Sequence, residues 1–254
     1  MDLGIDTVSA DVSLALLRGD HVLASQRWCV KTTLSRELLS GLDELLSAGG
    51  IARSELARIA VCAGPGAYTA IRTGVATAQG LALALDVPLA GVSRLEADVL
   101  PHIGRGQPVV AVHDAGRGRL AWAAYASSSM PGMPPLELVA PQSDNAVGCA
   151  VSAPKGALWC GELTEELRTA LATAGRPLVP GDEPSTEGEG NRRSASGVLR
   201  LARLHDGFGV PELVDAVYLR PPPITRPREF VRGTMQFHSP RTTDAGGTGG
   251  AVEE

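Results

Sequence analysis

The sequence lacks the residue patterns of zinc proteins, disulfide-stabilised proteins and membrane proteins. Its 254 residues include only 4 cysteines, and no two of them form a CxxC pair. Such spacing supports neither a structural zinc site nor a redox centre, so we expect free thiols in a reducing, cytoplasmic compartment. No apolar run approaches the roughly 18 residues of a membrane span. Met1 leads directly into an apolar strand, without the basic and apolar segments of a signal peptide.

Positive charge and clustered histidines are also scarce. The formal net charge is −5, whereas proteins that bind RNA through their own surface usually carry a basic face. We therefore expect any RNA contact to be made by a partner. The 5 histidines include no HxxxH or HExxH pair, which argues against a metallopeptidase because that chemistry needs two facing imidazoles. No Walker A or G-x-S-x-G sequence occurs, and we predict no catalytic residue and no metal ligand.

What is present is an alternation of strand-like and helix-like segments. Apolar runs at residues 3–5, 12–17 and 21–30, joined by tight turns, predict an antiparallel meander. Leucines at helical spacing over residues 38–46 then predict a helix that a glycine pair ends. Strands that are followed by helices alternating with further strands indicate an α/β layer.

The second half of the chain repeats this organisation. Residues 109–112 and 120–126 predict two strands joined by a glycine-bearing turn, and residues 157–160 predict another strand. The remaining segments are a strand at 136–139, helices around 53–58, 142–151, 162–174 and 194–205, and an acidic surface loop at 181–191.

Residues 63–97 are the most informative stretch. The Gly64-Pro65-Gly66 sequence predicts a tight turn, because glycine reaches positive φ and proline fixes φ. We expect a helix after it, capped by Thr69, and a strand at residues 89–92. One side of this helix is apolar, and another carries small residues that let a second helix approach closely. The apolar side consists of Ile71, Val75, Ala78, Ala82 and Leu85, and the small side of Ala70, Thr73, Thr77, Gly80 and Ala84.

Arg72 is the exception in this helix. It lies near the N-terminus, where the helix macrodipole disfavours a cation by roughly 0.3–1 kcal/mol. We therefore expect a compensating group, which is a carboxylate within the fold, a bound anion or an acidic group of a partner. An internal ion pair is the simplest of these.

The same stretch resembles a known family. The sequences GPGAYTAIR at residues 64–72, GLALAL at 80–85 and PLAGVSRLEA at 88–97 are similar to the signature of the TsaB (YeaZ) family of tRNA threonylcarbamoyladenosine biosynthesis proteins. The usual family form of the first motif is close to GPGSFTGLR, from which this chain departs at Ala67, Tyr68 and Ala70.

The resemblance implies a two-lobed, actin-like α/β fold of the ASKHA, ribonuclease H-like class, with mixed sheets flanked by helices. It implies an N-terminal lobe with interface helices at residues 1–100 and a C-terminal lobe at 101–225. Residues 226–254 carry no resemblance to the family, and their glycine-rich, acidic composition predicts a disordered tail.

The resemblance also implies a function. A TsaB-like protein is a non-catalytic subunit that pairs with a TsaD-like catalytic subunit, joined by a TsaE-like ATPase, to transfer threonylcarbamoyl to N6 of adenosine 37 in tRNA. ATP and Mg would serve the complex, tRNA would be bound only through the complex, and the same helices would also serve a homodimer. The residues expected to build and orient the partner helix are Gly64, Pro65, Gly66, Thr69, Arg72, Thr73, Gly74, Thr77 and Gly80.

Two enzyme hypotheses stay open. In the actin-like superfamily an acid after the first strand faces nucleotide phosphates and their metal, so Asp6, Thr7 and Asp114 form a possible nucleotide site. We interpret this site as degenerate, because no glycine stands between Asp6 and Asp11 although phosphate loops need small residues. The alternative function is an ATPase or phosphotransferase that uses Asp6 and Asp114. A metallopeptidase-like protein is a weaker alternative.

Overall fold

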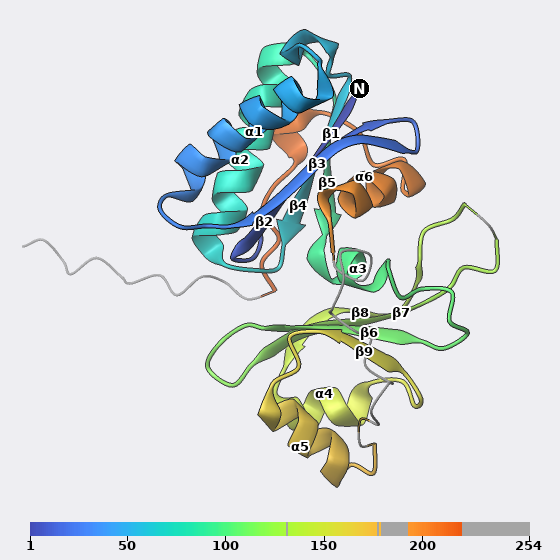
Figure 1. The fold of residues 1–254 in the computed structure, drawn as a ribbon. Coiled ribbons are helices and arrows are strands. Elements are labelled where there is room, and N and C mark those ends of the chain that lie inside the picture. Colours follow the sequence, from blue (N-terminus) through green and yellow to red (C-terminus); the bar gives the residue numbers. More distant parts are fainter. Residues whose placement is uncertain (131, 177, 179–192, 220–254) are drawn as a thin grey trace, which may run out of the picture. The chain divides into compact units, whose positions relative to one another are not determined.

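The computed structural model describes residues 1–130, 132–176, 178 and 193–219, which lie within one compact unit, residues 1–222. Two β-sheets carry helices on their faces, which confirms the predicted α/β class with mixed sheets flanked by helices (Figure 1). In the described part of the chain, no helix has the length and apolar character needed to cross a lipid bilayer. The predicted loop at 181–191 and tail at 226–254 lie outside the described residues.

The first sheet has the strand order β3-β2-β1-β4-β5. Its first three strands form the predicted antiparallel meander, and β1, β4 and β5 run parallel to one another. Asp6 therefore ends the central strand. The bounds are β1 (Asp2–Asp6), β2 (Asp11–Arg18), β3 (His21–Cys29), β4 (Arg58–Gly64) and β5 (Leu89–Ser93).

Helices cover both faces of the first sheet (Figure 1). Helices α1 (Leu34–Gly49) and α2 (Tyr68–Leu85) lie on one face, and α6 (Ala195–Leu204) lies on the other. Helix α1 ends as predicted, since Gly50 follows it with the left-handed φ of 64° that a glycine adopts without strain. All three helices are amphipathic and bury one side against the strands.

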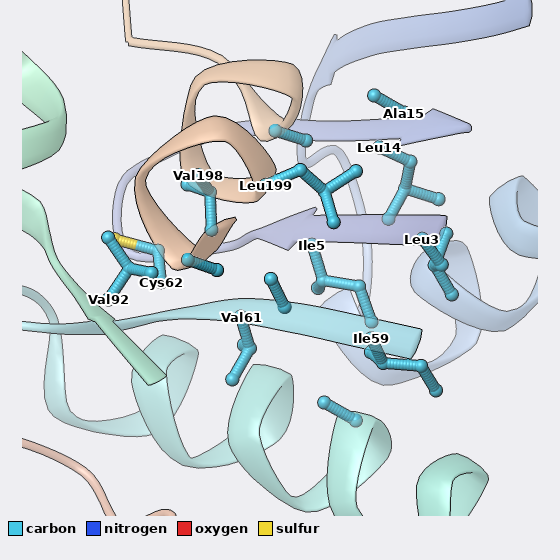
Figure 2. Packing of buried hydrophobic residues seen from close by; sticks show 14 of the residues in the cluster. Leu3, Ile5, Leu14, Ala15, Ile59, Val61, Cys62, Val92, Val198 and Leu199 are labelled. Atoms are coloured by element: carbon cyan, nitrogen blue, oxygen red, sulfur yellow. The ribbon is translucent and has the colours of Figure 1, made fainter. Parts of the chain in front are cut away.

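The core of the first sheet has two layers, because successive side chains of a strand point to opposite faces. Figure 2 shows Cys62 and Val92 on the side of α6, near its residue Val198, whereas Ile5 and Val61 lie on the side of α2. Ile5 and Val61 are direct neighbours in the parallel pair of β1 and β4. Each layer is closed off from water by the helices that cover its face of the sheet.

The second sheet has the order β8-β7-β6-β9. Its strands are β6 (Val109–Asp114), β7 (Leu120–Ala126), β8 (Leu136–Asp144) and β9 (Leu158–Gly161). Helices α4 (Ala146–Ser152) and α5 (Glu165–Thr173) contribute to the core on one face, and α3 (Arg94–Val99) contributes to the core on the other. Strand β6 pairs antiparallel with β7 and parallel with β9, as β1 does with β2 and β4.

Three local expectations differ from the structure. Strand β8 extends to Asp144, so the helix predicted around 142–151 starts only at Ala146, after Asn145 accepts from the Gly148 amide at 2.8 Å. Segment 53–58 forms a single turn, η1 (Arg53–Glu55), because β4 already begins at Arg58. Helix α3 was not predicted. Its sequence, RLEADV, alternates polar and apolar residues with the period of a strand, although all six residues are buried in the helix.

The chain returns to the first sheet after it completes the second. Helix α6 is held by Arg203, whose Nη2 donates to Oδ2 of the buried Asp2 at 2.6 Å. Beyond α6, the C-terminal strap, which we define as residues 208–219, includes the short turn η3 (Pro211–Leu213). Gly209 and Leu89 exchange two backbone hydrogen bonds of 3.0 Å. The predicted boundaries of the two lobes stay predictions.

Candidate functional site

The Gly64-Pro65-Gly66 turn has a structural role inside the first sheet. Gly64 has a φ of 110°, and a Cβ on it would lie 2.7 Å from the carbonyl oxygen of Val217 in the strap. A Cβ on Gly66 would collide with the carbonyl oxygen of Val8, in the turn after β1. Pro65 is buried. These residues place the start of α2 against the β1–β2 turn and the strap, so they orient the helix from within.

Helix α2 begins two residues earlier than its proposed cap requires. Ala67 is the N-cap residue and makes no side-chain cap, so the prediction that Thr69 caps the helix is wrong. Thr69 lies in the first turn, and its carbonyl oxygen accepts from Oγ1 of Thr73 at 2.9 Å. The Thr73 hydroxyl thus finds its hydrogen-bond acceptor within the helix, at the carbonyl four residues earlier.

The inward side of α2 is confirmed as apolar, with Ile71, Val75, Ala78 and Ala82 buried. Gly74 is buried on this side too, where a Cβ would collide with Oγ1 of Thr7. That hydroxyl donates to the carbonyl oxygen of Ala70 at 2.9 Å. Thr7 and Gly74 therefore belong to the contact between the β1–β2 turn and α2, and neither lies on the outer surface of the helix.

The outward side of α2 carries few large side chains. We define the docking face as the exposed residues of α2 together with the exposed leucine of α1: Leu39, Tyr68, Thr69, Arg72, Ala76, Gly80, Leu83 and Ala84. Thr73 and Thr77 are half-buried beside it. A Cβ on Gly80 would meet nothing within 4 Å. Leu39 and Leu83 are 56% and 51% exposed.

Arg72 does not form the expected internal ion pair within the described part of the chain. Its guanidinium carbon lies 4.6 Å from the centroid of the Tyr68 ring, and its Nε donates to the Tyr218 hydroxyl at 3.2 Å. The hydrogen bond to Tyr218, followed by the charge interaction with Tyr68, raises the pKa of Arg72. Two tyrosines thus take the place of the expected carboxylate. The sequence could have indicated Tyr68, which precedes Arg72 by four residues and so lies beside it on the helix.

A second group of polar residues lies where strands of both sheets end at their carboxyl edges, the usual position of ligand sites in α/β proteins. A cleft of about 280 Å³ is lined there by Ser9, Asp11, Arg27, Arg94, Asp98, His102, Cys160, Gly161, Glu162 and Arg193. Burial is the largest influence on the Cys160 thiol and raises its pKa, so it is no thiolate nucleophile.

Arg193 occupies the centre of this edge. Its Nε donates to Oδ2 of Asp6 at 2.6 Å, and its Nη1 donates to Oδ1 of Asp98 at 2.5 Å. Its Nη2 reaches the Ser9 hydroxyl at 3.1 Å. Burial alone would lower the pKa of Arg193, but the carboxylates of Asp6 and Asp98 hold it well above the ordinary value. A fixed internal cation therefore satisfies Asp6.

The ion pairs continue from α3 to the second sheet. Arg94 lies 3.4 Å from Asp98 through Nε and donates from Nη2 to Glu162 at 2.6 Å. His113 Nδ1 lies 2.8 Å from Oε2 of Glu162. Burial would raise the pKa of Glu162, yet the hydrogen bond from His113 and the charge of Arg94 lower it to about 2. Glu162 is therefore an anion at any physiological pH.

The residues at this edge do not fit a magnesium nucleotide. Asp6, the expected phosphate-facing acid, is engaged by Arg193. Asp114 is exposed and accepts from the Gly116 amide of its own turn at 2.8 Å, which is the capping role of a turn aspartate. Neither it nor Asp6 lines the cleft. No role was predicted for Arg193, Arg94, Asp98 or Glu162, because all their ion pairs except Arg94–Asp98 join residues that are distant in the chain. Among the described residues no cluster of three potential metal ligands occurs.

Comparisons with known proteins agree on one family. The family model described as "TsaD: tRNA N6-adenosine threonylcarbamoyltransferase" matches residues 29–155. The tRNA threonylcarbamoyladenosine biosynthesis protein TsaB of Bacillus subtilis is 39% identical over 37% of this chain and 41% of its own length. The TsaB of Escherichia coli is 33% identical over 48% and 54%. The chain thus spans about half the length of the curated relatives it matches.

Transferases of the same family are also similar, among them the tRNA N6-adenosine threonylcarbamoyltransferase of Nitratidesulfovibrio vulgaris, at 37% identity over 39% of this chain and 31% of its own. The solved structure of YeaZ from Pseudomonas aeruginosa superposes with a TM-score of 0.67 at 24% identity, covering 86% of this chain and 99% of that one, which shows the shared fold. The chain therefore belongs to the TsaD family of the actin-like superfamily, in its TsaB (YeaZ) branch.

Proposed function

We propose that this chain is a non-catalytic subunit for the synthesis of N6-threonylcarbamoyladenosine in tRNA, and that its docking face binds a TsaD-like catalytic subunit. A TsaE-like ATPase joins the assembly, and tRNA is bound through the complex in the cytoplasm. The same face also serves a homodimer when the catalytic subunit is absent. The residues that form or orient the docking face are those of the Gly64-Pro65-Gly66 turn and of α2.

The outward stripe of α2 is the observation that carries the proposal. Ala76, Gly80 and Ala84 leave the helix backbone open over several turns, so a partner helix can approach at the short end of the roughly 8–10 Å range of axis separations. Leu39 and Leu83 add apolar surface that a partner would remove from water.

The absence of bond chemistry is supported by the engagement of the charged groups in the cleft and of Asp6 beside it. Asp6, Asp98, Arg94 and Glu162 each pair with another protein group. A general base or nucleophile needs a polar atom that is free to meet the substrate. Asp114 is exposed but lies outside the cleft and is engaged with its own turn.

Substitution of Gly80 tests the docking face. Gly80→Arg places a long cation in the centre of the stripe and should reduce binding of the TsaD-like chain from the same organism by about a hundredfold or more, because a buried unpaired charge is strongly unfavourable. Ala172→Arg, on the exposed side of α5, is the matched control and should bind as the unmodified chain does. Binding is measured by calorimetry, and circular dichroism verifies the fold. Equal binding by both variants contradicts the proposal.

The enzyme alternative has a separate test. Calorimetry of the isolated chain with Mg-ATP should show no binding in the micromolar range and no turnover, since Asp6 is held by Arg193. Turnover that is lost in Asp6→Asn or Asp114→Asn would instead establish the ATPase or phosphotransferase function. Elemental analysis for stoichiometric metal addresses the metallopeptidase hypothesis in the same preparation.

A further inference from the structure

Arg72 is held at the edge of the docking face by two aromatic rings. We call Tyr68, Arg72 and Tyr218 the tyrosine–arginine corner. The rings of Tyr68 and Tyr218 stack with centroids 5.2 Å apart and an interplanar angle of 28°. Arg72 lies over the Tyr68 ring and donates from Nε to the Tyr218 hydroxyl. These contacts fix the direction of the guanidinium before any partner arrives.

The charge of Arg72 is nevertheless not neutralised within the described part of the chain. No carboxylate there forms an ion pair with it, and among the described residues its side chain makes one hydrogen bond, from Nε. Asp215 raises the pKa of Arg72, but as the smallest contributor, since it lies beyond ion-pair distance. The Nη1 and Nη2 atoms therefore keep their N–H groups for an acceptor outside the described residues. A planar guanidinium offers these groups as a fork that fits a carboxylate.

The surface beside the corner is built by the C-terminal strap, which exposes apolar side chains together with the acids Glu212 and Asp215. Leu213 is 81% exposed and Val217 is 44% exposed. The strap is anchored to the first sheet, since Gln79 of α2 donates to the carbonyl oxygen of Val214 at 2.7 Å and the Val217 amide donates to that of Ala63 at 2.7 Å. The strap therefore presents its apolar side chains from a fixed backbone.

We propose that Arg72 is the charged anchor of the docking face, and that it pairs with a carboxylate on an otherwise apolar segment of the catalytic partner. This inference rests on the proposed function and adds the chemistry of the partner to it. The contact combines arginine and tyrosine, two of the residue types that dominate binding energy at interfaces, with the apolar surface of Val217. Charge complementarity selects an acidic partner group, because Arg72 lacks a counter-ion in the described part of its own chain.

Four variants of the full-length chain test the anchor by calorimetry and by association kinetics with the TsaD-like chain. Arg72→Met should weaken binding about tenfold to a hundredfold, and Arg72→Lys by about threefold to tenfold because lysine lacks the fork. Arg200→Met, which removes an exposed arginine of α6, should stay within about twofold of the unmodified chain. Tyr218→Phe keeps the ring but removes the hydroxyl that Arg72 contacts.

Salt dependence distinguishes an anchor from a support for the strap. Between about 50 mM and about 300 mM salt, the association rate of the unmodified chain should fall, and Arg72→Met should remove much of that dependence. If Tyr218→Phe matched Arg72→Met in affinity while both kept the salt dependence, Arg72 would be only a strap contact and the inference would be wrong. Unchanged binding by Arg72→Met, with binding lost in Gly80→Arg, would overturn the anchor and leave the docking face intact. No binding by the unmodified chain would instead overturn the proposed function.

Discussion

At the scale of single residues, the cleft is organised by charges that satisfy one another. Arg193 lies between Asp6 and Asp98, and Arg94 links Asp98 to Glu162. Such a buried series of ion pairs gives little net stability, because desolvation of the ions offsets their attraction. Removal of one member is different, since it leaves a buried charge without its partner.

Replacement of Arg193 should therefore destabilise the protein strongly. Arg193→Ala leaves two buried carboxylates facing each other, and we expect it to lower the free energy of unfolding by about 3–5 kcal/mol. The double variant Arg193→Ala with Asp6→Asn should recover part of that loss, because the repulsion is gone. Chemical denaturation measures both, with Arg200→Ala on the exposed side of α6 as the control. A loss similar to that of the control would mean that the ion pairs do not form.

Glu162 should make the free energy of unfolding depend on pH in the acid range. Its pKa falls from an ordinary value of 4.5 to about 2 in the folded protein. The lowered value stabilises the fold at every pH above 4.5, and this contribution disappears as the pH falls from 4.5 towards 2. Glu162→Gln should lower the free energy of unfolding by about 1 kcal/mol at neutral pH, a modest loss because water screens a side chain that is 42% exposed. Its free energy of unfolding should also decline less steeply in acid.

The measurement for Glu162 is the denaturant midpoint as a function of pH. Glu166→Gln, on the exposed side of α5, should retain the full acid dependence. Parallel curves for Glu162→Gln and the unmodified protein would show that His113 and Arg94 do not hold the carboxylate.

At the scale of elements, α2 contains two glycines with opposite environments. Gly74 faces Thr7, where a Cβ would collide with the hydroxyl oxygen, and Gly80 faces open space. Both lie inside one helix, so the intrinsic preference of the helix for alanine is the same at each position. Any difference between them must come from packing.

Alanine at the two positions should change stability in opposite directions. Gly80→Ala should raise the free energy of unfolding by about 0.5–1 kcal/mol, because it removes a flexible residue from a helix. Gly74→Ala should lower it by about 1–3 kcal/mol, because the added methyl group forces β1 and α2 apart. Thermal denaturation of the pair tests both signs at once. A stabilising Gly74→Ala would show that Thr7 moves freely.

Elements with a regular pattern were predictable from the sequence, and contacts between distant elements were not. The strand at 120–126 and the apolar side of α2 follow from alternation and helical spacing, which are local properties. Asp6 and Arg193 are 187 residues apart, and no local pattern marks an arginine that will end between two carboxylates. Thr69 was misassigned because α2 already begins at Tyr68, and no sequence pattern marks Ala67 as the residue that precedes it.

At the scale of the whole molecule, the two sheets share one arrangement of strands. In each, a strand ending in an aspartate, Asp6 or Asp114, pairs antiparallel with its successor and parallel with a later strand. The two aspartates nevertheless have different environments. Asp6 is buried and ion-paired, whereas Asp114 is exposed on its turn. Similar architecture has therefore not preserved similar chemistry.

The return of the chain to the first sheet has a consequence for how the molecule can be divided. Residues 195–219 supply a wall of the first core, although they are translated after the second sheet is complete. A fragment that stops at residue 100 would expose the layer containing Cys62 and Val92 to water. The second sheet is topologically a long insertion within the first. A minimal protein would therefore need residues 195–219 joined directly to the first sheet, and a nascent chain cannot complete its first core until those residues have been synthesised.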